Sequence, residues 1–233
     1  MRFFFMLLAL VLSVTVRAES DLSIHSGFFN AEGEDSGFSL DGDLDTLELR
    51  YRLSLTDKVV AEVSYSDRQG EFTLTTGGTT EYEATEIEAL VGYTFCMDGD
   101  CDSSFTPYIG YRKFEAKNAL TAFGVAINVD QERDIVPVGL AYEKKSGALE
   151  YGIDVSFGRK VSDDQIIPRL GVNQSSDDNW TYQVKVPVRY VVDEHFYVEF
   201  RYEIEEVRFS DSMDARFARE ENSQFSFGAG YRF

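Results

Sequence analysis

Two cysteines, Cys96 and Cys101, lie five positions apart on either side of the tetrapeptide Met-Asp-Gly-Asp. In an oxidising compartment, two thiols so close in sequence most simply form a disulfide. The loop that they would close is short, so its entropic stabilisation is modest. No motif of redox enzymes accompanies the pair. We therefore expect a structural disulfide, with a redox role as the alternative.

Alternate aspartates form two Asp-Gly-Asp-x-Asp runs, Asp41/Asp43/Asp45 and Asp98/Asp100/Asp102. Alternate carboxylates can share a calcium ion. An EF-hand loop also needs a glutamate at its twelfth position, which is Arg52 in the first run and Ile109 in the second. The runs therefore read as polar turns rich in Asp and Gly. We predict no dedicated metal site and no cofactor.

The chain has two histidines, His25 and His195, which are its candidates for general-base chemistry. His25 is followed by Ser26, but neighbouring residues of a strand point to opposite faces, so they would not form a nucleophile–base pair. No Gly-x-Ser-x-Gly element is present. We assign no catalytic residue, and keep a lipid-active enzyme acting through His25 as an alternative.

The elements that must position these residues are strands. Apolar and polar residues alternate in about ten segments, which is a strand signal. Their approximate bounds are 21–30, 44–55, 59–68, 83–95, 105–114, 134–144, 147–159, 180–192, 196–209 and 225–233. Short connections alternate with long acidic ones. The pattern predicts an all-β fold, a transmembrane antiparallel up-and-down β-barrel of about ten strands, with eight as the alternative count.

Composition and the N-terminal residues agree with this fold. Aromatic residues make up 14% of the chain and the formal net charge is −19. Such an acidic protein is not suited to bind nucleic acid, which requires a basic surface. Arg2, an apolar run over 3–12 and Ala18 match a secretory signal peptide. We expect residues 1–18 to be that signal and residues 19–233 to be the barrel domain.

The alternation also predicts the register of the hairpins. If every apolar face points outward to lipid, four pairs of opposite charge face each other in the lumen. These pairs are Arg52 with Glu62, Glu88 with Arg112, Lys185 with Glu203, and Arg189 with Glu199. Matched charges favour a plugged lumen, whereas a selective pore would show a surplus of one sign. Trp180 and Tyr190, ten residues apart on one outward face, are expected to mark the two aromatic girdles.

The last nine residues, FSFGAGYRF, place Phe225, Phe227, Tyr231 and Phe233 on one face of a closing strand. This strand resembles the C-terminal signal that the barrel-assembly machinery of Gram-negative bacteria reads. With the signal peptide and the alternating hairpins, the chain resembles small outer-membrane barrels of the OmpA/OmpX type. The resemblance implies an integral outer-membrane location, short periplasmic turns, long extracellular loops, and contact with membrane lipid and lipopolysaccharide.

The resemblance carries no catalytic residue over. Omptin proteases, which are ten-stranded barrels, use an Asp-x-His at the outer rim, whereas Asp193-Glu194-His195 would lie in a periplasmic turn. We therefore expect a non-enzymatic barrel with a plugged lumen and acidic loops for envelope or partner interaction. Divalent cations bound loosely at these loops are a hypothesis. A narrow channel or small porin is the first alternative, and a lipid-active enzyme is the second. The oligomeric state is not predicted.

Overall fold

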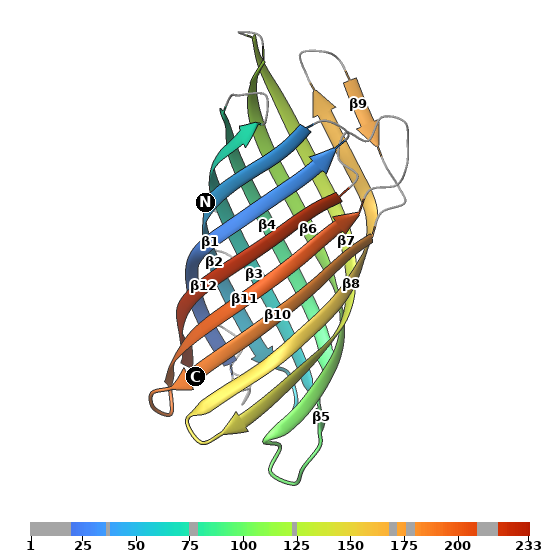
Figure 1. Cartoon of the computed structure of the whole chain (residues 1–233). Coiled ribbons are helices and arrows are strands. Elements are labelled where there is room, and N and C mark those ends of the chain that lie inside the picture. The colour runs from blue at the N-terminus through green and yellow to red at the C-terminus, as the bar shows by residue number, and fades with distance from the viewer. Residues whose placement is uncertain are drawn as a thin grey trace.

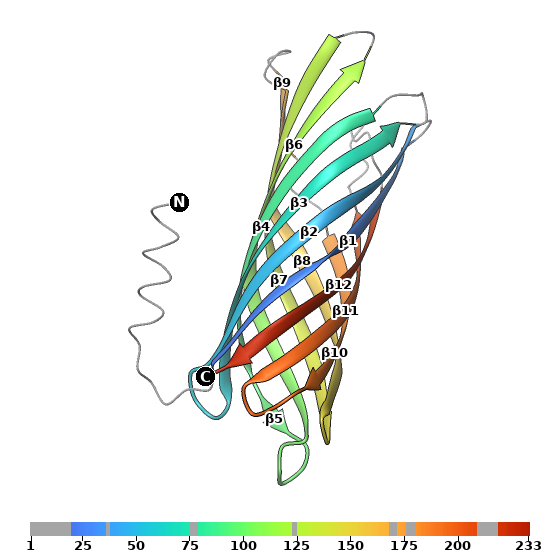
Figure 2. The same ribbon diagram turned by 90° about the vertical axis from the view of Figure 1, so that its left-hand side faces the viewer.

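The computed structural model describes residues 20–35, 38–74, 79–122, 125–167, 172–175, 180–208 and 219–233. All regular elements in these ranges are strands (Figures 1 and 2). They are β1 (Ser20–Asp35), β2 (Phe38–Ser54), β3 (Val59–Leu74), β4 (Thr79–Tyr93), β5 (Phe95–Cys96), β6 (Ser103–Ala122), β7 (Val125–Ser146), β8 (Leu149–Ile167), β9 (Val172–Ser175), β10 (Trp180–Val191), β11 (Phe196–Arg208) and β12 (Arg219–Arg232). Within the described ranges, no helix has the length and apolar character to cross a membrane.

Ten of these strands form a closed antiparallel barrel, as the sequence predicted. Each long strand pairs with its neighbour in chain order, and β10 pairs with β8. The sheet closes where β1 pairs with β12, from Asp21 opposite Arg232 to Glu34 opposite Arg219. The two short strands are extensions: β5 pairs only with β6, and β9 pairs only with β8.

The barrel has two unlike ends. At one end, which we call the turn end, short connections such as 55–58 and 192–195 join the strands, and the C-terminal residue Phe233 lies there (Figure 1). At the other, which we call the hairpin end, the strands run on as paired hairpins. The hairpin of β6 and β7 projects farthest in both views (Figures 1 and 2).

The strands at the hairpin end are longer than the sequence predicted. Segments expected to be long loops, such as 31–43 and 115–133, are largely paired strand, up to Asp35 opposite Phe38 and Ala122 opposite Val125. Glycine and acidic residues keep their backbone N–H and C=O groups. The ladder of hydrogen bonds between the two strands of a hairpin can therefore continue through them as long as the register is kept. The middle of the loop predicted over 160–179 and most of the one over 210–222 lie outside the described residues.

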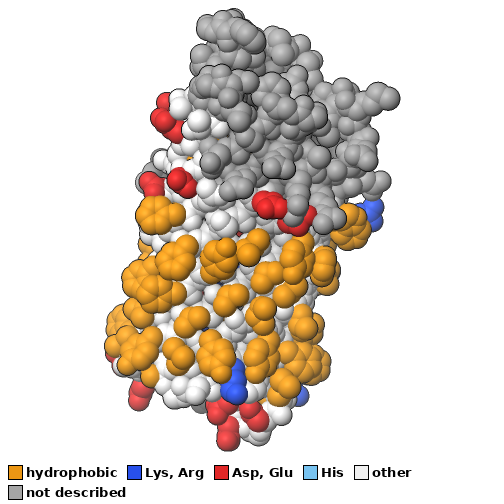
Figure 3. Space-filling model, in the orientation of Figure 1, with side chains coloured by type: hydrophobic (Ala, Val, Ile, Leu, Met, Phe, Trp, Pro, Cys, Tyr) orange, Lys and Arg blue, Asp and Glu red, His pale blue; other side chains and the backbone are white. Residues whose placement is uncertain are grey.

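The outer wall carries a belt of apolar side chains across the middle of the described surface in Figure 3, with charged side chains above and below it. Ile24, Phe28, Val138 and Phe200, from three different strands, have at least 47% of their surface exposed. Exposed apolar side chains of this extent require an apolar solvent, which is the lipid core of a membrane. Trp180 and Tyr190, at opposite ends of β10, both point outward.

Inside the barrel, the hairpin end contains an apolar group that the sequence analysis did not foresee. Its members come from β1, β2, β3, β4 and β6, and we call them the inner apolar cluster. They are Phe29, Leu44, Phe72, Tyr82, Ala84, Phe114 and Ala116. The rings of Phe72 and Tyr82 meet edge to face at 4.7 Å. Packed apolar side chains therefore fill part of the lumen at this level.

Candidate functional site: the charged lumen

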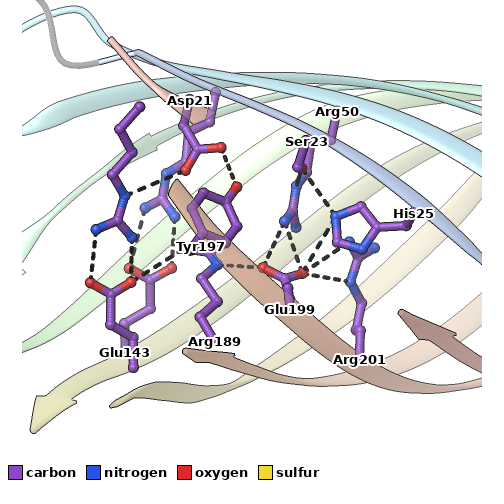
Figure 4. Close-up of polar contacts among 12 residues, drawn as sticks. Asp21, Ser23, His25, Arg50, Glu143, Arg189, Tyr197, Glu199 and Arg201 are labelled. Atoms are coloured by element: carbon purple, nitrogen blue, oxygen red, sulfur yellow. Dashed lines mark hydrogen bonds and ion pairs between the residues drawn. The ribbon is translucent and has the colours of Figure 1, made fainter. Parts of the chain in front are cut away.

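One carboxylate, Glu199 on β11, is the centre of the first group of lumen charges (Figure 4). Arg50 of β2 donates two hydrogen bonds of 2.9 Å to its oxygens, and Arg201 donates one of 3.1 Å. Arg189 of β10 donates another through Nε. Arg201 also reaches Glu48, at 2.8 and 2.9 Å. We call this set the Glu199 node; it joins three strands around a carboxylate that is 0% exposed.

His25 of β1 borders the Glu199 node. Its Nε2 shares a hydrogen bond of 3.0 Å with the hydroxyl of Ser23 and lies 3.8 Å from Glu199. Ser23, and not the adjacent Ser26, is thus the serine beside His25, as follows from the rule that residues two apart share a face of a strand. The other nitrogen, Nδ1, has no hydrogen-bond partner among the described residues. Both Ser23 and His25 are 1% exposed, so no substrate reaches this pair in the folded barrel.

A second group of charges has an arginine at its centre. Arg112 of β6 donates to Glu88 at 3.0 Å, to Glu205 at 2.6 Å and to Gln183 at 2.7 Å. Its partners come from β4, β11 and β10, so this arginine spans the lumen. We call these four residues the Arg112 node. Each of the three guanidinium nitrogens thus has an acceptor, which offsets part of the cost of burying the arginine.

The third group lies at the turn end and is more open to water. Arg52 pairs with Glu143 at 2.6 Å, and Arg232 pairs with Glu150. The side chains of Arg52 and Glu143 are 23% and 32% exposed. Exposed pairs of this kind contribute less to stability than buried ones.

The structure confirms all four predicted registers. It also brings Arg189 to Glu199 and Arg112 to Glu88, as expected. The other two expected contacts are wrong. Arg52 lies opposite Glu62 but its guanidinium reaches across to Glu143, and Lys185 contacts Glu88 at 3.4 Å.

The reason is geometric. In a barrel of ten strands, long side chains reach partners on strands beyond their neighbours, which a hairpin register cannot describe. The carboxylate of Glu203, expected to meet Lys185, instead accepts a hydrogen bond from Gln183 at 2.5 Å. Glu62 forms no ion pair with any described cation and lines the lumen cavity.

That cavity has a volume of about 90 Å³ and lies between the Glu199 node and the opposite wall. Charged side chains form about half of its lining, among them Glu62, Asp154 and Lys185. Its volume holds a few water molecules. Neither Ser23 nor His25 lines it.

Two tyrosines fill the lumen beside glycines. Tyr197 lies against Gly230 of the neighbouring strand and donates a hydrogen bond to Asp21. Tyr108 lies against Gly139 and donates to Asp154 at 2.7 Å. A side chain at either glycine would overlap the ring, at 2.1 Å in one case and 2.3 Å in the other. These glycines are therefore required by the close approach of the rings.

Outside the lumen, Cys96 and Cys101 form a disulfide in the turn between β5 and β6. In the same turn, the carboxylate of Asp98 accepts hydrogen bonds from the N–H groups of Asp102, at 2.8 Å, and Ser103, at 2.9 Å. This aspartate thus has the structural role of a turn residue. In the described part of the chain, no group of three His, Cys, Asp or Glu side chains is placed to hold a metal ion.

The Asp193-Glu194-His195 string forms the turn between β10 and β11. The Asp193 carboxylate accepts hydrogen bonds of 2.8 Å from the N–H groups of His195 and Phe196, which hold its pKa below the usual value. The His195 ring stacks on Tyr231. Asp193 therefore stabilises the turn through backbone groups.

A closed antiparallel barrel with an apolar outer belt and a charged interior defines a transmembrane β-barrel. The chain belongs to the outer membrane protein β-barrel domain family, whose model matches residues 4–233. It is thus an integral outer-membrane protein, as the sequence predicted. Comparison with curated proteins gives no match.

Solved structures share the fold at low sequence identity. The outer-membrane protease OmpT of Escherichia coli is 13% identical with a TM-score of 0.57, over 93% of this chain and 96% of that one. The translocator domain of the autotransporter NalP of Neisseria meningitidis is 9% identical with a TM-score of 0.51, over 98% of this chain and 93% of that one. These likenesses concern the barrel alone, since one of the two proteins is a protease and the other a translocator.

Proposed function

We propose that this protein is a non-enzymatic outer-membrane barrel with a closed lumen, which presents acidic hairpins to the envelope surface. The observation that carries the proposal is the packing of side chains inside the lumen at two levels. The Arg112 node links four strands across the lumen, and the inner apolar cluster packs nearer the hairpin end. Below them remains a cavity of only about 90 Å³.

The buried state of Ser23 and His25 supports the non-enzymatic part of the proposal. A nucleophile and a base need a space where a reacting atom can sit. The only described histidine–serine pair has no such space, because both residues are 1% exposed and neither borders the cavity.

Conductance tests the closed lumen. We expect the full chain, reconstituted in planar bilayers, to show no unit conductance. Replacing Phe72 and Phe114 by alanine, together with Arg112→Ser, would remove material at both levels and is expected to produce steps of current. Steps of reproducible size from the unaltered protein, absent from bilayers without it, would contradict the closed lumen and favour the narrow channel.

The orientation of the barrel in the outer membrane follows from the difference between its two ends. Outer-membrane barrels place short turns in the periplasm and long connections outside the cell. We infer that the turn end faces the periplasm. Residues 1–18 would then act as the signal peptide that brings the chain there, and the closing strand with Phe233 would be recognised during assembly.

The outer face of the hairpins supports an interaction with lipopolysaccharide. Asp43, Glu71 and Glu81 lie side by side on three adjacent strands, all exposed. Like charges directly opposite each other destabilise a sheet. Divalent cations shared with lipopolysaccharide phosphates would remove this repulsion, since carboxylates are ligands that Ca²⁺ and Mg²⁺ prefer.

This interaction predicts that a chelator lowers the thermal stability of the protein in membranes that contain lipopolysaccharide. The double variant Glu71→Gln/Glu81→Gln should respond less, because its carboxamides repel neither each other nor Asp43. An equal response of the two proteins would refute the role of these carboxylates.

A further inference from the structure

An open groove of about 390 Å³ lies on the lipid-facing wall near the turn end, over β3, β4 and β6. The backbone of Gly92 and Tyr108 forms part of its lining. The rest comes from outward-facing apolar side chains, namely Val59, Val91, Tyr93, Pro107 and Ile109.

The groove coincides with a break in the sheet. The pairing of β4 with β6 ends at Gly92 opposite Tyr108 and resumes on β5 at Phe95 opposite Phe105. Pro107 lies in the gap and has no N–H group to donate, so the ladder cannot continue there. In its place, the hydroxyls of Thr94 and Thr106 share a hydrogen bond of 3.0 Å.

Lys58 stands at the turn-end edge of this groove. Its backbone is fixed, because its N–H donates to the Thr56 hydroxyl at 3.2 Å and its carbonyl accepts from the N–H of Thr94 at 2.6 Å. Its Nζ lies 6.0 Å from the centre of the Tyr93 ring, which lines the groove. Lys58 is exposed, and none of the ion pairs between described residues includes it.

An aromatic run continues from the groove toward the turn end. The ring of Tyr93 meets that of Phe95 at 4.8 Å, and Phe95 stacks on Phe105 at 4.9 Å. Aromatic side chains gather where the hydrocarbon core meets the headgroups. Lys58 is therefore held at headgroup level, while the groove extends from it into the apolar belt.

We propose that this groove and Lys58 bind one anionic phospholipid of the periplasmic leaflet. An acyl chain occupies the apolar groove, and the Lys58 ammonium contacts the headgroup phosphate. Charge complementarity selects the headgroup, because a lysine without a carboxylate partner attracts an anionic lipid more strongly than a zwitterionic one. The proposal rests on the inferred orientation of the turn end, which would otherwise meet lipopolysaccharide.

The test uses the full chain in a mild detergent, with the retained lipid measured by native mass spectrometry. We expect phosphatidylglycerol to be retained in preference to phosphatidylethanolamine. Lys58→Gln should lower the retention of phosphatidylglycerol about fivefold, the factor that one lysine provides at an anionic lipid surface. Lys145→Gln is the matched control: Lys145 is also an exposed turn-end lysine, but unlike Lys58, which precedes Val59, it is not next in sequence to a residue that lines the groove.

A second variant tests the apolar part. Val91→Trp fills the groove from the lipid-facing side, where a tryptophan is compatible with the strand, and should lower retention while leaving Lys58 in place. Heat-dependent migration in gel electrophoresis confirms that each variant is folded.

Equal retention by Lys58→Gln and the unaltered protein would overturn the proposal. Equal retention of the two phospholipids, or displacement by lipid A as effective as by phosphatidylglycerol, would overturn it as well. Lumen conductance has no bearing on these outcomes, because the groove lies on the outer wall.

Discussion

The Glu199 node and the Arg112 node have opposite charge arrangements. In the first, three guanidinium groups surround one carboxylate; in the second, two carboxylates and an amide oxygen surround one guanidinium. Both centres are buried, with exposed fractions of 0% and 2%. Each node joins strands that are not neighbours in the sheet, so each fixes the cross-section of the barrel.

The charge of the central side chain decides whether acid can neutralise the buried charges that remain when that side chain is removed. A carboxylate that loses its cation can take up a proton at mildly acidic pH and become neutral. A guanidinium cannot lose its proton in a protein. Removing Glu199 therefore leaves buried positive charges that no accessible pH relieves, whereas removing Arg112 leaves carboxylates that acid can neutralise.

The largest effect is expected from Glu199→Gln. The substitution keeps the shape of the side chain but removes the charge that three arginines share, which should cost about 4 kcal/mol. Urea unfolding of the vesicle-bound protein, followed by the fluorescence of Trp180, the only tryptophan, measures this loss. Glu194→Gln in the exposed turn is the control. A loss no larger than that of the control would show that the Glu199 node does not hold the barrel.

Arg112→Met is expected to cost somewhat less at pH 7, about 3 kcal/mol, because methionine fills part of the vacated volume. Lowering the pH to 5 should recover much of this loss. The folded variant gains protons on buried carboxylates over this range and the unfolded chain gains fewer, so stability rises as the pH falls. Unfolding midpoints at the two pH values measure the gain. If Glu199→Gln recovered equally, the contrast between the two nodes would be wrong.

The smallest effect is expected at the turn end. Arg52→Gln should cost less than about 1 kcal/mol, because water screens a pair with 23% and 32% exposure. A double-mutant cycle with Glu143→Gln should show a coupling energy, and one with Glu62→Gln should show almost none. The reverse result would mean that the hairpin register, and not the reach across the lumen, decides the pairing.

The sequence predicts those parts of the site that depend on period two and on hairpin register. Arg189 meets Glu199 and Glu88 meets Arg112 because each pair lies on adjacent strands, and the outward apolar face leaves only one register. Arg50 and Arg201 reach Glu199 and Glu48 from strands more than 140 residues apart in sequence. Such contacts depend on the stagger and tilt of the closed barrel, which alternation does not specify.

The inner apolar cluster was missed for a different reason. The strands expected from the sequence end near the membrane boundary, so Phe72 falls in an expected loop. The signal was nevertheless present: Phe72 has the same inward phase as Glu62 and Arg68, and Phe114 the same phase as Arg112. Following the alternation to Phe114, the last residue of its expected strand, and past the expected boundary to Phe72 would have placed apolar rings inside the barrel, above the charges.

The length of β6 and β7 has a mechanical consequence. These strands contain 20 and 22 residues, whereas a tilted strand crosses the membrane with about ten. The surplus carries their hairpin about 25 Å beyond the apolar band. The projecting hairpin is thus a direct continuation of the barrel wall, with no flexible linker between the two. A force applied at the tip would act as a lever on the whole barrel and tilt it in the bilayer, so a load on the hairpin would be borne by the lipid around the wall.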